Sequence, residues 1–174
     1  MKKILLSVIV MVAFIDVACA QSTPFGLKAG VNFARLGADA DDAAGITSFY
    51  AGGLADITIS ESFHVQPEIM YSSEGAEDIK ISLIRIPILA KFYIGKRFNL
   101  QAGPSLNVKL PTDDVELDEM IKRVDYGLAF GAAYELPGGL FCDVRYNFSL
   151  TSVSDTDEMD ILINTLQFGL GYRF

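Results

Sequence analysis

Large apolar residues alternate with small or polar ones along most of this chain, and a period of two is typical of β-strands with one apolar face. The alternation predicts eight strands, over residues 25–34, 49–60, 63–71, 83–93, 98–109, 125–136, 140–149 and 164–174. Short turns at residues 61–62, 94–97 and 137–139 alternate with four longer loops, at residues 36–47, 72–78, 111–123 and 151–163. In the second strand, Ile57 and Ile59 share the apolar face with Phe49 and Ala55. The pattern therefore predicts an all-β, antiparallel, up-and-down protein.

The face opposite the apolar one combines glycines with charged side chains. Its glycines are Gly26, Gly30, Gly52, Gly103, Gly127, Gly131, Gly169 and Gly171. Glycine weakens a strand that faces water, whereas the narrow interior of an eight-stranded barrel needs small residues beside large ones. Charges of both signs on this face suit a closed interior, where they must be paired. We therefore predict a structural polar network in the lumen, formed by Lys28, Asp56, His64, Glu68, Arg85, Lys91, Lys109, Asp125, Glu135, Asp143, Arg145 and Arg173.

An apolar exterior around a polar lumen is the arrangement of a transmembrane β-barrel, the inverse of a soluble lipocalin-type barrel. The predicted strands run near ten residues, enough for a tilted strand to cross a bilayer. Aromatic residues such as Phe25, Tyr71 and Tyr134 lie toward strand ends, where such barrels carry aromatic girdles. We predict an eight-stranded antiparallel up-and-down transmembrane β-barrel, closed by pairing of the first strand with the last. A soluble sandwich or lipocalin-like barrel is the alternative.

The last predicted strand continues to the final residue of the chain. Its apolar face carries Leu166, Phe168, Leu170, Tyr172 and Phe174. An apolar row at a chain end needs a place to be buried, and a lipid bilayer provides one. The ending NTLQFGLGYRF also resembles the signal read by the outer-membrane barrel assembly machinery, in which a terminal aromatic residue recurs. We expect Phe168, Leu170, Tyr172 and Phe174 to form this C-terminal assembly signal, with the bilayer and the assembly machinery as partners.

The chain begins with a lysine pair, an apolar run and the triplet Ala-Cys-Ala, which together predict a secretory signal peptide over residues 1–20. The apolar run is shorter than a bilayer-spanning helix, and Asp16 stands where a lipoprotein site needs an aliphatic residue. Residues 21–174 then form one outer-membrane β-barrel domain. Cys142 is the single cysteine of that domain, so it has no partner for an internal disulfide.

The chain carries 22 acidic and 14 basic residues, a formal net charge of −8, which argues against a nucleic-acid partner. Of the 22 acidic residues, 15 lie in the four longer loops, which face the exterior in barrels of this kind. They are Asp39, Asp41, Asp42, Glu74, Glu77, Asp78, Asp113, Asp114, Glu116, Asp118, Glu119, Asp155, Asp157, Glu158 and Asp160. The loops thus predict a strongly acidic extracellular surface, suited to divalent cations or to a basic extracellular or envelope protein.

His64 is the single histidine, so a histidine-based catalytic or metal site would have to include it. It follows a short turn, at the opposite end of the barrel from the outer rim, where membrane-embedded acyltransferases and proteases place their catalytic groups. The chain contains no phosphate-binding loop, CxxC pair or HExxH motif. We therefore expect no enzymatic activity, no cofactor and no metal site within the barrel.

Segments along almost the whole predicted domain resemble the PorT-like family of small outer-membrane β-barrel proteins. They are FGLKAGVNFARL, FHVQPEIMYSSEGA, ISLIRIPILAKFYI, FNLQAGPSLNV, DYGLAFGAAYEL, DVRYNFSLTSV and NTLQFGLGYRF. The resemblance implies an eight-stranded barrel in a Gram-negative outer membrane and implies little about activity. We expect a structural or interaction protein whose long loops form its binding surface. A narrow channel is one alternative, disfavoured because side chains just fill an eight-stranded barrel, and a membrane-embedded enzyme is another.

Overall fold

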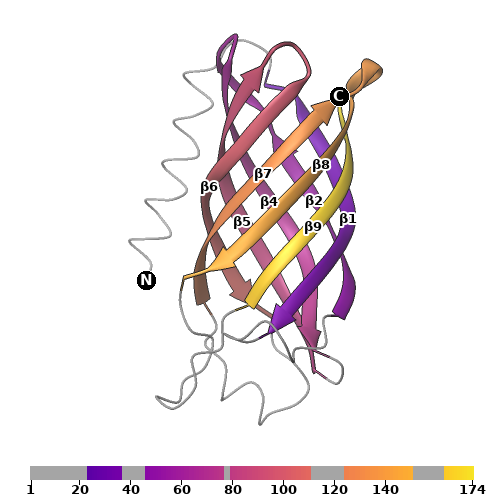
Figure 1. Ribbon diagram of the computed structural model, residues 1–174, viewed down its shortest axis with the longest axis vertical. Helices are drawn as coiled ribbons and strands as arrows, with labels where there is room; N and C mark the ends of the chain where they lie inside the picture. The colour runs from indigo at the N-terminus through magenta and orange to yellow at the C-terminus, as the bar shows by residue number, and fades with distance from the viewer. Residues whose placement is uncertain (1–22, 37–45, 77–78, 111–123, 151–162) are drawn as a thin grey trace.

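The computed structural model describes residues 23–36, 46–76, 79–110, 124–150 and 163–174, nearly all of them in strands (Figure 1). The predicted signal peptide, and every acidic loop residue named above except Glu74, lie outside these ranges. The strands are β1 Phe25–Leu36, β2 Ile46–Ala55, β3 Ile57–Ser60, β4 Phe63–Ala76, β5 Ile79–Ile94, β6 Phe98–Lys109, β7 Val124–Glu135, β8 Leu140–Ser149 and β9 Ile163–Arg173. Within the described ranges, no helix is long and apolar enough to cross a membrane.

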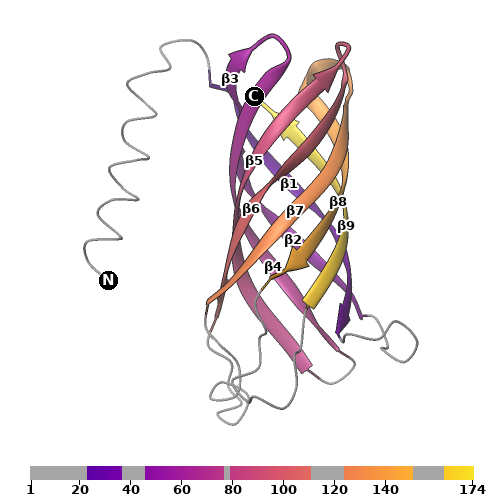
Figure 2. The ribbon, with the colours of Figure 1, turned by 60° about the vertical axis from the view of Figure 1, so that its left-hand side comes forward.

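The strands form one closed antiparallel sheet. Consecutive strands pair from β3 to β9, and β2 pairs with both β1 and β4. The circle closes because β1 also pairs with β9, from Gly26 opposite Arg173 to Leu36 opposite Ile163. Strands β2 and β3 both pair with β4 and are two parts of one interrupted strand. The eight-stranded barrel closed between its first and last strands is therefore confirmed. The C-terminus lies at the same end of the barrel as the short turns (Figure 2).

The predicted second strand is divided at Asp56 into β2 and β3, but its register on β4 does not change. Leu54 lies opposite Glu68, and Ile57 lies opposite Val65. Ile57 therefore keeps the predicted outward parity, although its side chain is only 5% exposed, and Ile59 is exposed on the outer wall. The backbone N–H of Asp56 donates to the carbonyl of Pro24, at 2.9 Å, which continues the ladder between β1 and β2.

The hairpin between β4 and β5 is longer than the apolar pattern predicts. These strands contain 14 and 16 residues, and their ladder continues to Ala76 opposite Ile79. The segment 72–78, predicted as a long loop, is therefore mostly strand. Regular backbone pairing continues here through residues that are small or charged, where the sequence has no clear apolar period.

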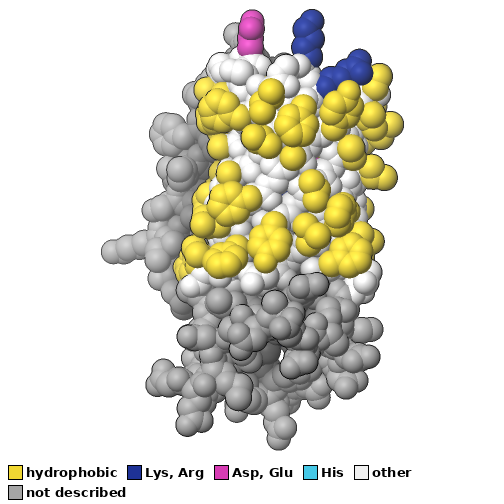
Figure 3. All heavy atoms as spheres, viewed as in Figure 1, with side chains coloured by type: hydrophobic (Ala, Val, Ile, Leu, Met, Phe, Trp, Pro, Cys, Tyr) yellow, Lys and Arg dark blue, Asp and Glu magenta, His cyan; other side chains and the backbone are white. Residues whose placement is uncertain are grey.

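The predicted apolar face forms the outer wall. Figure 3 shows hydrophobic side chains over the barrel wall on the face drawn, with charged side chains at one rim. Leu170 is 66% exposed and Phe174 is 72% exposed, values that a water-soluble fold rarely gives to a row of large apolar groups. The other faces of the strands point inward and bury charged and amide side chains. Apolar residues outside and polar residues inside are the distribution required of a barrel in lipid.

Candidate functional site

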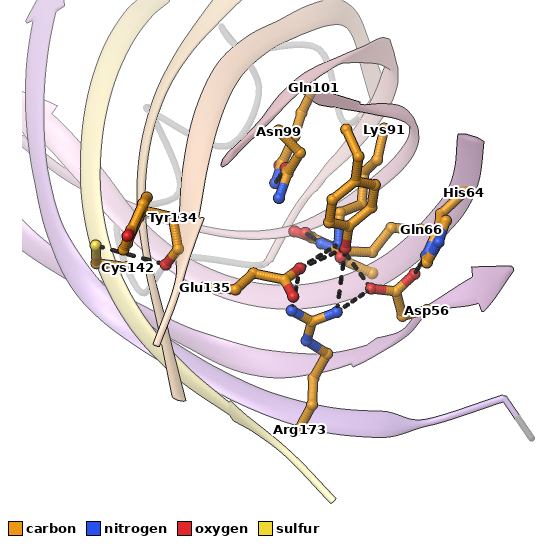
Figure 4. Close-up of polar contacts among 12 residues, drawn as sticks. Asp56, His64, Gln66, Lys91, Asn99, Gln101, Tyr134, Glu135, Cys142 and Arg173 are labelled. Carbon is orange, nitrogen blue, oxygen red and sulfur yellow. Dashed lines mark hydrogen bonds and ion pairs between the residues drawn. The ribbon is translucent and has the colours of Figure 1, made fainter. Parts of the chain in front are cut away.

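The charged residues of the lumen gather mainly in two clusters. The central cluster comprises Lys28, Glu68, Asp143 and Arg145. The turn-end cluster lies toward the short turns and comprises Asp56, His64, Lys91, Tyr93, Glu135 and Arg173 (Figure 4). Both are built by inward-facing positions of strands that are far apart in the sequence.

The central cluster is an almost fully buried arrangement of two cations and two anions. Arg145 donates from Nη1 and Nη2 to the two carboxylate oxygens of Glu68, at 2.6 and 2.9 Å. Lys28 donates to Asp143 at 2.7 Å, and its Nζ lies 3.9 Å from Glu68. Gln101 accepts a further bond from Arg145, at 2.9 Å. The side chains of all four charged residues are at most 2% exposed, so their charges are balanced by one another rather than by water.

The turn-end cluster is organised around the carboxylate of Asp56. His64 Nδ1 lies 2.7 Å from Asp56 Oδ1, while Lys91 donates to Oδ2 at 2.6 Å. Arg173 donates to the same Oδ2 and pairs with Glu135 through its other terminal nitrogen. Asp56 thereby connects the break between β2 and β3 to β4, β5 and β9, which lie around the barrel wall. The cluster is a cross-link between strands as well as a charge-balancing group.

Tyr93 completes the turn-end cluster. Its hydroxyl donates to Glu135 and accepts a 3.4 Å bond from Arg173, and its ring centroid lies 4.6 Å from that of His64. A cavity of about 590 Å³ opens at this end of the lumen and is lined by members of the cluster together with Lys96 of the β5–β6 turn. The turn-end cluster therefore forms the floor of a polar mouth, below which the central cluster begins.

The remaining predicted lumenal residues lie apart from the two clusters. Arg85 donates to Asn107 at 3.0 Å, and Asn107 donates to Asp125 at 2.9 Å. Asp125 also accepts a 2.8 Å bond from Ser149. Lys109 is buried at the last position of β6. The structure thus brings together nine of the twelve predicted residues in the two clusters, His64 included. It also connects two more, Arg85 and Asp125, through the side chain of Asn107.

Neutral residues that the sequence analysis did not select also belong to the lumenal network. Asn32 donates to Ser72 at 2.8 Å and accepts from Gln167 at 2.7 Å, and all three are buried. Gln66 donates to Glu68 at 2.6 Å. These residues share the inward parity of the charged ones, which is the signal that would have identified them. Selecting residues by charge alone therefore omitted the neutral side chains of the lumenal network.

The arrangement favours structural pairing over chemistry. The Asp56 carboxylate that contacts His64 is also held by Lys91 and Arg173, so it is not dedicated to orienting a catalytic imidazole. Among the described residues, no group of three His, Cys, Asp or Glu side chains is placed to hold a metal ion. The predicted cation-binding loop acids lie outside the described residues, apart from Glu74.

Comparison with known proteins identifies the kind of barrel. A family model described as outer membrane protein beta-barrel domain matches residues 19–155. No curated protein sequence matches the chain.

Solved structures share its fold. The attachment invasion locus protein Ail of Yersinia pestis has 15% identity and a TM-score of 0.54, over 88% of this chain and 100% of that one. Neisserial surface protein A has 15% identity and a TM-score of 0.56, over 86% and 97% of the two chains. Outer membrane protein AlkL has 10% identity and a TM-score of 0.55, over 88% and 91%. At such identities the likeness shows the fold alone.

Proposed function

This chain belongs to the outer membrane protein beta-barrel domain family, and from that premise we propose that it is an interaction barrel with a closed lumen, whose long acidic loops bind a partner outside the cell. The observation that carries the proposal is the central cluster, in which four charged side chains pair across the lumen with almost no exposure. When the lumen is closed in this way, the two ends of the barrel are the surfaces that remain for binding a partner. This role needs no enzymatic activity.

The central cluster also argues against the channel alternative. A solute passing along the lumen would have to part Arg145 from Glu68, two buried charges joined by two hydrogen bonds. Separating such a pair without replacement partners costs several kcal/mol, roughly 3–5 when one partner is removed outright. Eight strands leave little space beyond what these side chains occupy.

The finer assignments belong to the same proposal. The segments quoted above support membership of the PorT-like group, and the N-terminal pattern supports a signal peptide over residues 1–20. With export, the short turns would face the periplasm and the long loops the exterior, as in other bacterial barrels. The loops would then present most of the acidic residues to a basic protein or to divalent cations.

The loop assignment is tested by neutralising one loop in the full-length protein expressed in cells. Asp113, Asp114, Glu116, Asp118 and Glu119 are changed to their amides, and photo-crosslinking is carried out from a probe at Val115. We expect a discrete crosslinked partner with the wild type and its loss with the neutralised loop, because the attraction is electrostatic. Glu61→Gln, at the opposite rim, is the matched control and should leave the crosslink intact. A crosslink unaffected by loop neutralisation would contradict an acidic binding surface.

The C-terminal assembly signal gives a separate prediction. Phe174 is exposed on the outer wall, and its backbone N–H donates to the carbonyl of Phe25 at 2.9 Å. We expect deletion of Phe174 to lower the amount of barrel in the outer membrane several-fold while export continues, because the terminal aromatic is part of the signal. Immunoblots of separated membranes measure the effect, with Phe174→Tyr as the control that keeps an aromatic ring. Equal outer-membrane levels after deletion would show that the terminus is not a signal.

A further inference from the structure

The turn between β5 and β6 carries two adjacent cations, Lys96 and Arg97, at the short-turn rim. Both residues are exposed, and neither takes part in an ion pair with another residue of the described ranges. Gly95 enters the turn with a φ of +77°, and the N–H of Glu135 donates to the Arg97 carbonyl at 2.8 Å. The turn is therefore fixed against β7 while its charged side chains remain available.

The outer wall directly beside this turn is apolar and aromatic. The exposed side chains nearest to it along β5 and β6 are Phe92, Ile94, Phe98 and Leu100. Phe98 pairs across the strands with Tyr134, which is also exposed. Figure 3 shows Lys and Arg side chains at the rim, immediately beyond such a band of hydrophobic side chains. Apolar wall, aromatic rings and cations thus follow one another along the barrel axis.

In an outer-membrane barrel this wall is covered by lipid acyl chains, so the headgroups of the same lipids lie at the level of the rim. We propose that the Lys96–Arg97 turn binds the phosphate headgroup of an anionic phospholipid in the leaflet at the short-turn end, with the acyl chains lying along Phe92, Ile94 and Leu100. Arg97 offers a planar fork of N–H donors to phosphate oxygens, and Lys96 adds a point charge.

Charge complementarity selects this occupant over a second copy of the chain. A two-fold contact through the turn would bring Lys96 and Arg97 close to the same cations of the other copy, which is unfavourable. The strand ends that the longer, acidic segments of the sequence connect lie at the opposite end of the barrel. The proposal concerns the short-turn end alone and holds whatever partner the long loops bind.

Lipid binding by the refolded barrel, residues 21–174 in neutral detergent, tests the proposal. Phosphatidylglycerol and phosphatidylcholine are titrated separately, and bound lipid is measured by native mass spectrometry. We expect the wild type to prefer phosphatidylglycerol. Removing each cation should weaken binding of that lipid roughly fivefold, the factor expected for one basic side chain at an anionic membrane surface. Lys96→Gln with Arg97→Gln should therefore abolish most of the preference, and Arg97→Gln alone should remove part of it.

Glu61→Gln is the matched control, since it removes a charge of opposite sign from the neighbouring turn. It should leave phosphatidylglycerol binding equal to or above that of the wild type. Phosphatidylglycerol binding unchanged in the double variant would overturn the proposal. So would an equal loss for phosphatidylcholine, because that result would indicate an apolar contact independent of headgroup charge. A shift in mobility between heated and unheated samples on a gel verifies that each variant is folded.

Discussion

Replacing Asp56 by alanine is expected to destabilise the barrel by about 3–5 kcal/mol, because it leaves the buried Lys91 and the partly buried Arg173 without their common partner. Asp56 is 0% exposed and accepts hydrogen bonds from Lys91 and Arg173. It also joins the break between β2 and β3 to the closing strand β9, so the variant loses a connection across the seam as well as a charge. Urea unfolding of the refolded protein in detergent micelles, followed by tyrosine fluorescence, measures the loss.

Two further variants separate the charge of Asp56 from its hydrogen bonds. Asp56→Asn keeps one carbonyl acceptor and removes the charge, and its stability should fall between those of the wild type and the alanine variant. His64→Ala removes a single, partly exposed member of the turn-end cluster and should cost much less. An alanine variant that unfolds at the same urea concentration as the wild type would show that the turn-end cluster does not hold the barrel together.

The second large effect is expected at the seam between β1 and β9, where Gly30 pairs with Gly169. A β-carbon added to Gly30 would overlap the carbonyl oxygen of Phe168 and would lie 2.8 Å from Tyr50 Cε1. A β-carbon added to Gly169 would overlap the hydroxyl oxygen of Tyr50, a residue that is 1% exposed. Tyr50 thus fills the space that the two glycines leave, and neither the ring nor the backbone can yield easily.

We therefore expect Gly30→Ala to destabilise the barrel by roughly 1–3 kcal/mol through overpacking, and to slow its folding into detergent or lipid vesicles. Gly53→Ala is the matched control, because its added β-carbon would meet a single neighbour, the Gly26 carbonyl at 3.8 Å, on the adjacent pair of strands β1 and β2. Folding yields and urea midpoints of the two variants give the comparison. Equal stability of both variants would mean that the seam does not depend on close approach at Gly30.

The strands and their orientation were predictable because alternation is a local property of each strand. Inward glycines and charges, together with outward aromatics, determined which face meets lipid, and the need to leave no open edge determined the pairing of β1 with β9. The break between β2 and β3 was not predictable in this way. The alternation continues through Asp56 with an unchanged register on β4, so the apolar pattern contains no sign of the interruption.

The membership of the lumenal network was partly predictable, but its pairing was not. Lys28 and Asp143 are separated by 115 positions, and their contact depends on the tilt and stagger of the strands around the barrel. When two residues of like charge lie on the same inward face, nothing in the sequence around either residue indicates which oppositely charged side chain it contacts. The neutral members, such as Gln101 and Tyr93, matter because buried charges have more hydrogen-bonding positions than their counter-ions can fill.

The central claim is that paired side chains close the lumen, and single-channel recording of the purified wild-type protein in planar lipid bilayers tests it most directly. Insertion is verified independently by protease protection of the same protein in vesicles. The account predicts that inserted protein gives no stable conductance steps above the bare bilayer, because Glu68 and Arg145 remain joined across the lumen. Reproducible, long-lived open steps from the inserted wild-type protein would contradict it.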